Sequence, residues 1–372
     1  MKILLIGEYS NVHNTLAKGL RELGHSVTVV SNGDFWKDYP RDIDVSRKPG
    51  KLGGIRLLCK VWRLLPSLRG FDIVQLINPM FLELRAERLF AVYRYLRKHN
   101  GRLVLCAFGM DYYWVDVCST RMPLRYSDFN IGNKLRSNKE ATEARRDWAG
   151  TAKERLNRLI AADCDGIVAG LYEYWVCYEP LFPSKTVFIP FPVQVQEYRE
   201  RPADTASAEK VHLFIGISRN RSEYKGTDVM LAAAQALRSK YPDKVDLKIA
   251  EGVPFSQYVK MMSGADAILD QLYSYTPSMN PLEAMARGII CVGGGEPENY
   301  EILGERELHP IINVLPTYES CLEELERLVL HRDMIPSLRR QSVEYVAKHH
   351  DYRKVARKYE AFYAGLLADR AE

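Results

Sequence analysis

Short apolar runs of strand length alternate with helical segments through most of this 372-residue chain. The runs are almost continuously apolar, which is typical of parallel strands that helices cover on both faces. In the first half of the chain they occupy 2–7, 26–30, 71–77, 102–108, 166–170 and 186–190. Helical segments such as 14–24 and 86–100 separate several of them. The pattern predicts an α/β fold.

The alternation begins again after a polar stretch at 193–210, which has no clear period and suits a linker. The second set of apolar runs lies at 211–217, 245–251, 267–272, 289–294 and 310–315. A chain of this length also suits two cores better than one. We therefore predict two doubly wound, Rossmann-like domains, at 1–192 and 193–350, that face a cleft and are followed by a helical tail at 351–372.

Composition and charge narrow the class of protein. Apolar content of 47%, charged content of 27% and a net charge of +5 fit a globular protein, and we expect no nucleic-acid partner. No apolar run approaches the roughly 20 residues that span a bilayer. The N-terminus enters a strand without a cleavage site, and the seven cysteines form no CxxC pair. We expect a cytoplasmic protein with reduced cysteines in its core.

A basic loop joins strand to helix at 216–231 and contains Arg219, Arg221, Lys225 and Gly226. A helix N-terminus favours anions, and added Arg and Lys side chains suit a diphosphate. The alternative is an ordinary solvated loop, and this stretch alone favours neither.

The sequence NPLEAMARG begins a helix at the same edge of the predicted sheet, with Asn280 and Glu283 as candidate ligand-binding residues. A carboxylate in a first helical turn can accept hydrogen bonds from paired ribose hydroxyls. It could equally serve the helix dipole alone. The glycines at 293–295 would let backbone approach a ligand, and 253–267 would supply either a wall for a base or core side chains.

The Lys-Gly loop, the apolar strand and LEAMARG together resemble the retaining nucleotide-sugar glycosyltransferases of the two-domain B-type fold, the family-4-like group. The resemblance implies that Arg219 or Arg221, with Lys225, binds the donor diphosphate, and that Glu283 binds the ribose. The C-terminal helix DYRKVARKYEAFYAGLL resembles the segment of that family that crosses back to the first domain.

One position departs from the family pattern. The family usually has a second Glu eight residues before the ribose-binding Glu, near the donor sugar, and here that position is Tyr275. Because of this position, Tyr275 is counted among the predicted donor-binding residues. Asp270 and Gln271, in ILDQL, are predicted to share the missing role. The departure bears on donor-sugar identity and stereochemistry more than on nucleotide binding.

Lys225 is predicted to act in catalysis, because its charge would stabilise the leaving diphosphate. Two residues of the first domain are further candidates for catalysis. The resemblance places His13, after the first strand, near donor phosphates and acceptor, although a lone histidine is usually structural. Asp111 follows another strand, where it could orient or deprotonate an acceptor hydroxyl. As an alternative, Asp111 would be a helix N-cap.

Other segments give weaker indications. Cations alternate with apolar residues in 51–69, which predicts either an interfacial helix for peripheral membrane contact or, slightly favoured, a core-facing helix with a basic solvent face. The polar stretch 115–150 is long for a loop and would be an acceptor-side insertion or lid. The triplets DID (42–44) and DCD (163–165) are poorly placed for a donor-bound metal, so we expect no metal and no cofactor.

We predict a glycosyltransferase that moves a hexose-like unit from a nucleoside-diphosphate sugar to a glycan or lipid-linked acceptor, as in polysaccharide biosynthesis. A sugar-nucleotide epimerase of similar fold and a non-catalytic nucleotide-sugar binder are the alternatives. A dinucleotide oxidoreductase is disfavoured because neither domain has GxGxxG after its first strand.

Overall fold

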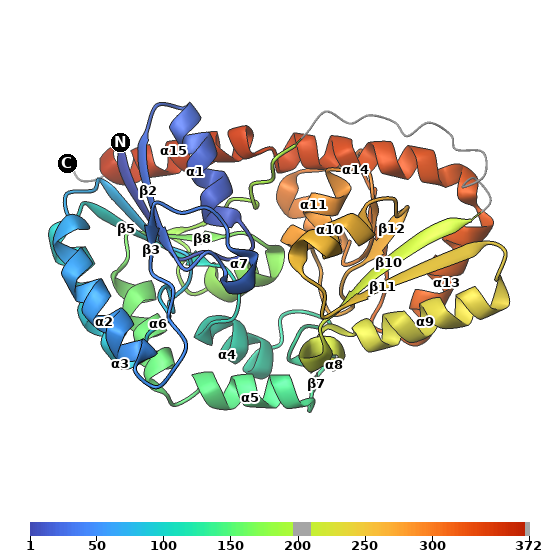
Figure 1. Cartoon of the computed structure of the whole chain (residues 1–372), viewed down its shortest axis with the longest axis horizontal. Coiled ribbons are helices and arrows are strands. Elements are labelled where there is room, and N and C mark those ends of the chain that lie inside the picture. Colours follow the sequence, from blue (N-terminus) through green and yellow to red (C-terminus); the bar gives the residue numbers. More distant parts are fainter. Residues whose placement is uncertain (196–209, 369–372) are drawn as a thin grey trace. The chain divides into compact units, whose positions relative to one another are not determined.

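A computed structural model describes residues 1–195 and 210–368 and divides into two compact units (Figure 1). The first unit contains Met1–Pro123, Glu143–Pro192 and the segment from Tyr352 onward. The second contains Leu124–Thr142 and Val193–Asp351. Leu124–Thr142, hereafter the 124–142 segment, therefore packs with the second unit although its neighbours in sequence belong to the first. Residues 196–209 of the predicted linker lie outside the described residues.

A parallel sheet forms the centre of the first unit. Within the described ranges it has seven strands in the order β3-β2-β1-β4-β5-β8-β9. The strands are β1 (Lys2–Ile6), β2 (Ser26–Ser31), β3 (Ile43–Asp44), β4 (Ile73–Leu76), β5 (Arg102–Ala107), β8 (Gly166–Ala169) and β9 (Thr186–Phe188). All six apolar runs predicted in this half are strands. The sequence pattern did not predict β3. This strand is too short for an apolar run, because only two of its residues pair with β2.

Helices follow most of these strands. They are α1 (Val12–Glu22), α2 (Gly53–Leu64), α3 (Ala86–His99), α4 (Tyr112–Thr120), α6 (Ala152–Asp163) and α7 (Tyr172–Tyr178). Helix α5 (Lys139–Trp148) begins in the 124–142 segment.

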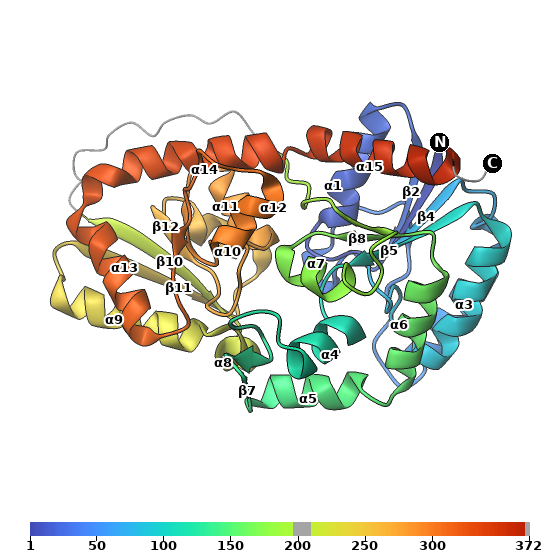
Figure 2. The same cartoon turned by 180° about the vertical axis from the view of Figure 1, so that it is seen from behind.

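The C-terminal helix α15 (Tyr352–Ala368) packs against α1 within the first unit (Figure 2). The two helices approach closely at Gly19, where a Cβ atom would lie 2.7 Å from the Cβ of Ala356. The Tyr352 hydroxyl donates a hydrogen bond of 2.7 Å to the Glu22 carboxylate, and Nε2 of His25 lies 2.8 Å from Oε1 of Glu360. Small residues and polar pairs therefore hold α15 on the first unit.

The second unit contains its own parallel sheet. Within the described ranges it has five strands in the order β11-β10-β12-β13-β14. They are β10 (Val211–Ile217), β11 (Val245–Glu251), β12 (Ala267–Leu269), β13 (Ile290–Gly293) and β14 (Ile312–Asn313). Each predicted run contains one of them, so the doubly wound α/β prediction is confirmed for this half as well.

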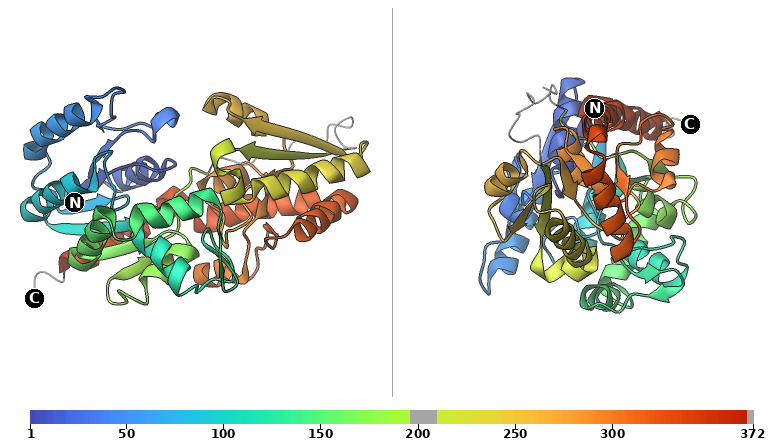
Figure 3. Two further views of the ribbon diagram at one scale, coloured as in Figure 1. Left: turned by 90° about the horizontal axis from the view of Figure 1, so that it is seen from below. Right: turned by 90° about the vertical axis from the view of Figure 1, so that its right-hand side faces the viewer.

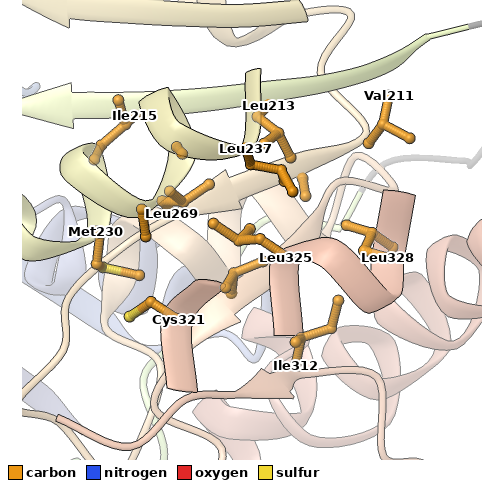
Figure 4. Close-up of a cluster of buried hydrophobic side chains, with 14 of the residues drawn as sticks. Val211, Leu213, Ile215, Met230, Leu237, Leu269, Ile312, Cys321, Leu325 and Leu328 are labelled. Atoms are coloured by element: carbon orange, nitrogen blue, oxygen red, sulfur yellow. The ribbon is translucent and has the colours of Figure 1, made fainter. Parts of the chain in front are cut away.

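Helices cover both faces of the second sheet. They are α8 (Ser222–Lys225), α9 (Thr227–Lys240), α10 (Phe255–Met262), α11 (Met279–Met285), α12 (Pro297–Leu303), α13 (Tyr318–Leu330) and α14 (Ile335–His349). On one face, strand residues such as Leu213 and Leu269 pack against Leu237 of α9 and Leu325 of α13 (Figure 4). On the other, Phe214 and Ile268 pack in a smaller cluster with Ala284 of α11. Figure 3 shows α9, in yellow, beside the strands from another direction.

The described residues include no helix long and apolar enough to cross a membrane. All seven cysteines are free, and six of them are buried, as the sequence predicts. The seventh, Cys59, is an exception because it lies on the exposed side of α2.

Candidate functional site

Two loops leave the same edge of the second sheet, because β10 and β12 are neighbouring parallel strands. The first loop continues from β10 through a 3₁₀ turn, η4 (Arg219–Arg221), and the short helix α8 into α9. The second follows β12 and runs into α11. The carboxyl edge of a parallel sheet is where α/β proteins bind ligands, so this edge is the candidate site.

The Lys225–Gly226 turn interlocks with the second loop. Gly226 has a φ of +73° and ends α8, as glycine does at helix C-termini. A Cβ atom there would lie 2.5 Å from the Cβ of Leu272. The Leu272 N–H donates a hydrogen bond of 2.8 Å to the carbonyl oxygen of Lys225. Glycine is therefore required by backbone conformation and by the close approach of the second loop.

Asp270 is a buried carboxylate directly after β12, with 7% of its surface exposed. Burial raises its pKa to about 6, and the positive charge of Lys225 opposes this shift in pKa. The structure thus brings together two predicted site residues, one from each loop. A buried acid with a raised pKa beside a lysine at a ligand-binding edge is a feature of functional sites.

Tyr258 of α10 lies close to two further candidate residues, Asn280 and Glu283. Its ring lies over the end of β10, where a Cβ on Gly216 would approach its hydroxyl oxygen to 2.8 Å. Asn280 donates a hydrogen bond of 2.9 Å to that hydroxyl. Burial chiefly, with the charges of Asp270 and Glu283, raises the pKa of Tyr258 to about 12, and the hydrogen bond from Asn280 opposes this shift in pKa. The sequence predicts a wall for a base or core side chains at 253–267 but does not single out Tyr258, whose only sequence signal is an aromatic side chain before β12.

Glu283 lies one turn later in its helix than the sequence predicts. Helix α11 begins at Met279 after Ser278, so Glu283 is the fifth helical residue and the first turn contains no acidic residue. A helix dipole acts mainly on its first turn. The position therefore weakens the alternative in which Glu283 serves only the dipole.

The other predicted donor-binding residues differ in their surroundings. Arg221 is exposed, and its guanidinium lies 5.2 Å from the ring centre of Tyr224. Arg219 lies in η4, and Gln271 is half-buried directly after Asp270.

Tyr275 makes contacts inside the second unit. It is 1% exposed, and its hydroxyl accepts a hydrogen bond of 2.7 Å from the backbone N–H of Arg125. The Arg125 guanidinium lies 4.8 Å from its ring centre. These contacts favour a role for Tyr275 in holding the 124–142 segment over the predicted role in donor binding.

The glycines after β13 serve internal packing. A Cβ on Gly294 would lie 2.2 Å from the carbonyl oxygen of Ser274, and one on Gly295 would lie 2.7 Å from the side chain of Ile311. The close approach that the sequence predicts is therefore made to the protein's own chain.

His13 is fully buried in the first unit. One ring nitrogen, Nδ1, lies 2.8 Å from the Gly7 carbonyl oxygen, and Nε2 lies 3.1 Å from the amide nitrogen of Gln75. Gln75 accepts a hydrogen bond of 2.7 Å from Tyr363 of α15. Both ring nitrogens are thus occupied, and burial lowers the pKa of His13 to about 3. These contacts favour the structural alternative over the predicted catalytic role.

Asp111 is the N-cap of α4. It is fully buried and accepts hydrogen bonds of 2.8 Å from the Trp114 N–H and from the Tyr178 hydroxyl. Burial raises its pKa to about 6. The N-cap alternative is therefore what the structure shows, and both carboxylate oxygens have partners within the protein.

The side chain of Glu8 lies at the N-terminus of α1, and no pattern in the sequence indicates this. It is 2% exposed and accepts hydrogen bonds from the N–H groups of His13, at 3.2 Å, and Asn14, at 2.8 Å. Burial raises its pKa to about 8. An internal carboxyl group thus fills the position where a helix N-terminus could otherwise receive a phosphate.

No group of three or more potential metal-ligating side chains occurs in the parts of the chain that the structure describes.

Residues 216–361 match the family model described as glycosyl transferase-like. This match confirms the predicted resemblance to glycosyltransferases over most of the second unit. A search of curated protein sequences finds no match.

Solved structures resemble the whole chain. Sucrose-phosphate synthase from Thermosynechococcus elongatus is 12% identical, with a TM-score of 0.62 over 99% of this chain and 100% of that one. Anabaena HepE in complex with UDP and glucose is 12% identical, with a TM-score of 0.59 over 98% and 100%. UDP-GlcNAc 2-epimerase from Neisseria meningitidis bound to UDP-GlcNAc is 12% identical, with a TM-score of 0.54 over 97% and 99%. The likeness confirms the two-domain B-type fold.

Proposed function

We propose that this protein is a glycosyltransferase whose second unit binds a nucleoside-diphosphate sugar. The observation that carries the proposal is the gathering of Lys225, Asp270, Asn280 and Glu283 at one sheet edge. That edge belongs to the segment that matches the glycosyl transferase-like family model. HepE was solved with UDP and with UDP-glucose, so UDP is the first nucleotide to test.

The proposed roles follow from charge and hydrogen bonding. Lys225, with Arg219 or Arg221, would stabilise the negative charge that develops on the leaving diphosphate. Glu283 would accept hydrogen bonds from the ribose hydroxyls. Asp270 and Gln271 would contact the donor sugar in place of the carboxylate that Tyr275 replaces. The transfer is proposed to be retaining and independent of metal.

We assign the acceptor to the first unit. Support comes from Glu8, because a carboxyl group at the N-terminus of α1 disfavours a second diphosphate site there. The acceptor would be a glycan or a lipid-linked sugar.

A lipid-linked acceptor would agree with an exposed apolar stripe on α2. Leu57 and Val61 of this helix are buried, whereas Ile55 and Trp62 are 60% and 47% exposed. Cys59 lies between Ile55 and Trp62 at helical spacing and is exposed as well. The helix therefore has a core-facing side, as the favoured sequence interpretation has it, and a second apolar side. The cations Arg56, Lys60 and Arg63 directly follow these exposed residues in the sequence. We therefore propose a peripheral contact with an anionic lipid surface.

Donor turnover tests the proposed activity. With UDP-glucose and a mixture of lipid-linked and free glycans, we expect UDP release that depends on acceptor and persists with a chelator. Lys225→Ala should lower the rate by at least roughly tenfold with the fold intact, since it removes a charge that stabilises the leaving group. An epimerase would instead convert the sugar nucleotide when no acceptor is added, so its turnover would not depend on acceptor. A non-catalytic binder would bind the nucleotide and do neither.

A further inference from the structure

The 124–142 segment contains a short β-hairpin that belongs to the second unit. Its strands β6 (Asn130–Ile131) and β7 (Lys134–Leu135) pair antiparallel around Gly132. The side chain of Asn130 is fully buried and donates to the carbonyl oxygens of Leu124 and Gly132, each at 2.9 Å. Side-chain hydrogen bonds to backbone therefore define the shape of a hairpin whose strands are too short to do so alone.

One end of this segment is fixed to the loops after β12 and β13. The Arg125 guanidinium bonds to Glu296 at 2.6 Å and to Glu298 at 2.5 Å. Tyr126 donates to the other oxygen of Glu296, which is 4% exposed. Its ring also packs 5.0 Å from that of Tyr275. The segment is thus tied to the turn that follows the candidate site.

The other end supports α8 through Arg136, which is 8% exposed. Its guanidinium donates hydrogen bonds of 2.7 Å to the carbonyl oxygen of Glu223 and 3.0 Å to that of Tyr224. These are the carbonyl groups immediately before Lys225, at the C-terminal end of α8. A cation is favourable at a helix C-terminus, where the carbonyl groups carry partial negative charge.

The same guanidinium also contacts the second loop of the candidate site. It stacks on Tyr273, with 3.5 Å between its central carbon and the ring centre. Tyr273 follows Leu272, whose N–H is bonded to Lys225. Arg136 therefore spans the two loops that carry Lys225 and Asp270. Asp128, in the same segment, accepts the hydroxyl of Tyr224 and adds a second link to α8.

We propose that Arg136 is a positioning residue for donor binding, acting through the Lys225–Gly226 turn. Only a planar guanidinium can donate to two carbonyl groups and stack on a ring at once, so its role is to fix the distance between the two loops. Donor affinity then depends on a side chain that does not touch the donor. This inference deepens the proposed function and rests on it for the identity of the ligand.

The experiment compares Arg136→Met and Arg136→Lys with the control Lys134→Met. Methionine keeps much of the side-chain length, and Lys134 is an exposed cation of the same hairpin. UDP affinity is measured by calorimetry, and amide hydrogen exchange is measured at Gly226 and Leu272. Folding is confirmed for each variant by circular dichroism.

We expect Arg136→Met to weaken UDP binding by roughly tenfold or more, since misplaced binding groups lose much of their effect. Exchange at Gly226 and Leu272 should be faster in this variant. Arg136→Lys should remain closer to Arg136→Met than to the wild type, and Lys134→Met should match the wild type in both measurements.

Three results would overturn the inference: wild-type affinity in folded Arg136→Met, full recovery with lysine, or unchanged amide exchange. If the wild-type protein bound no nucleoside diphosphate, the proposed function would fail instead. The exchange measurement would then still decide whether Arg136 orders the turn.

Discussion

At the scale of single residues, Asp270 couples the candidate site to stability. Its folded-state pKa of about 6 lies above the ordinary value of 3.8 because the carboxyl group is buried. Ionising it therefore costs stability, and this cost is absent below about pH 4, grows as the pH rises to about 6, and is constant above. The shift in pKa corresponds to roughly 3 kcal/mol at neutral pH.

We predict that Asp270→Asn unfolds at a higher denaturant concentration than the wild type at pH 7.5. The difference should shrink as the pH falls toward 5, because the wild-type carboxyl group becomes neutral. Denaturant titrations at several pH values measure it. The result that contradicts this account is a stability difference that does not change with pH, or a variant that is less stable throughout.

Site residues differed in how far sequence could identify them. Lys225, Gly226 and Glu283 stand in recognisable local patterns, and the structure places them at the expected sheet edge. Tyr258, Arg136 and Glu8 do not, because each acts through a partner distant in sequence or through burial. His13 and Asp111 were singled out by their position after a strand. Both make buried internal contacts, which position alone cannot predict.

At the scale of elements, α2 carries a prediction about lipid surfaces. We expect the wild-type protein to pellet with vesicles that contain anionic lipid, less with neutral vesicles, and less at high salt. The double variant Ile55→Ser/Trp62→Ser should pellet less, since it removes exposed apolar area without touching Leu57 or Val61. Leu330→Ser, which changes an exposed apolar residue of the second unit, is the control.

Failure of the wild-type protein to pellet with either kind of vesicle would leave α2 as a core-facing helix with a basic outer side. Equal loss in the double variant and the control would mean that the effect is not specific to α2.

Regular elements were largely predictable, because buried parallel strands read as apolar runs. The run at 267–272 proved shorter as a strand, at 267–269, because the second loop of the candidate site begins at Asp270. The run at 310–315 pairs with β13 only at 312–313. The stretch 115–150 was predicted to be an acceptor-side insertion or lid, because it is long for a loop. It contains the end of α4, a hairpin and α5, and its pairs are too short to leave a periodic signal.

At the scale of the whole molecule, the repetition of the α/β pattern was enough to predict two Rossmann-like domains. What the pattern could not predict is that the chain leaves the first unit at Leu124 and returns at Glu143. The 124–142 segment is held on the second unit by side chains, chiefly Arg125 and Arg136. Their partners are carboxylates and carbonyl groups far away in the sequence.

We infer that the second unit binds a nucleoside diphosphate through Glu283 and its neighbours, and calorimetry with UDP tests this. The wild-type protein should bind UDP in the presence of a chelator. Glu283→Ala should weaken binding by roughly tenfold to a hundredfold, since it removes hydrogen bonds to a charged acceptor. Glu301→Ala, which removes an exposed carboxylate of the same unit, should bind as the wild type does. Absence of binding by UDP, GDP and ADP alike, or unchanged affinity in Glu283→Ala, would contradict the claim.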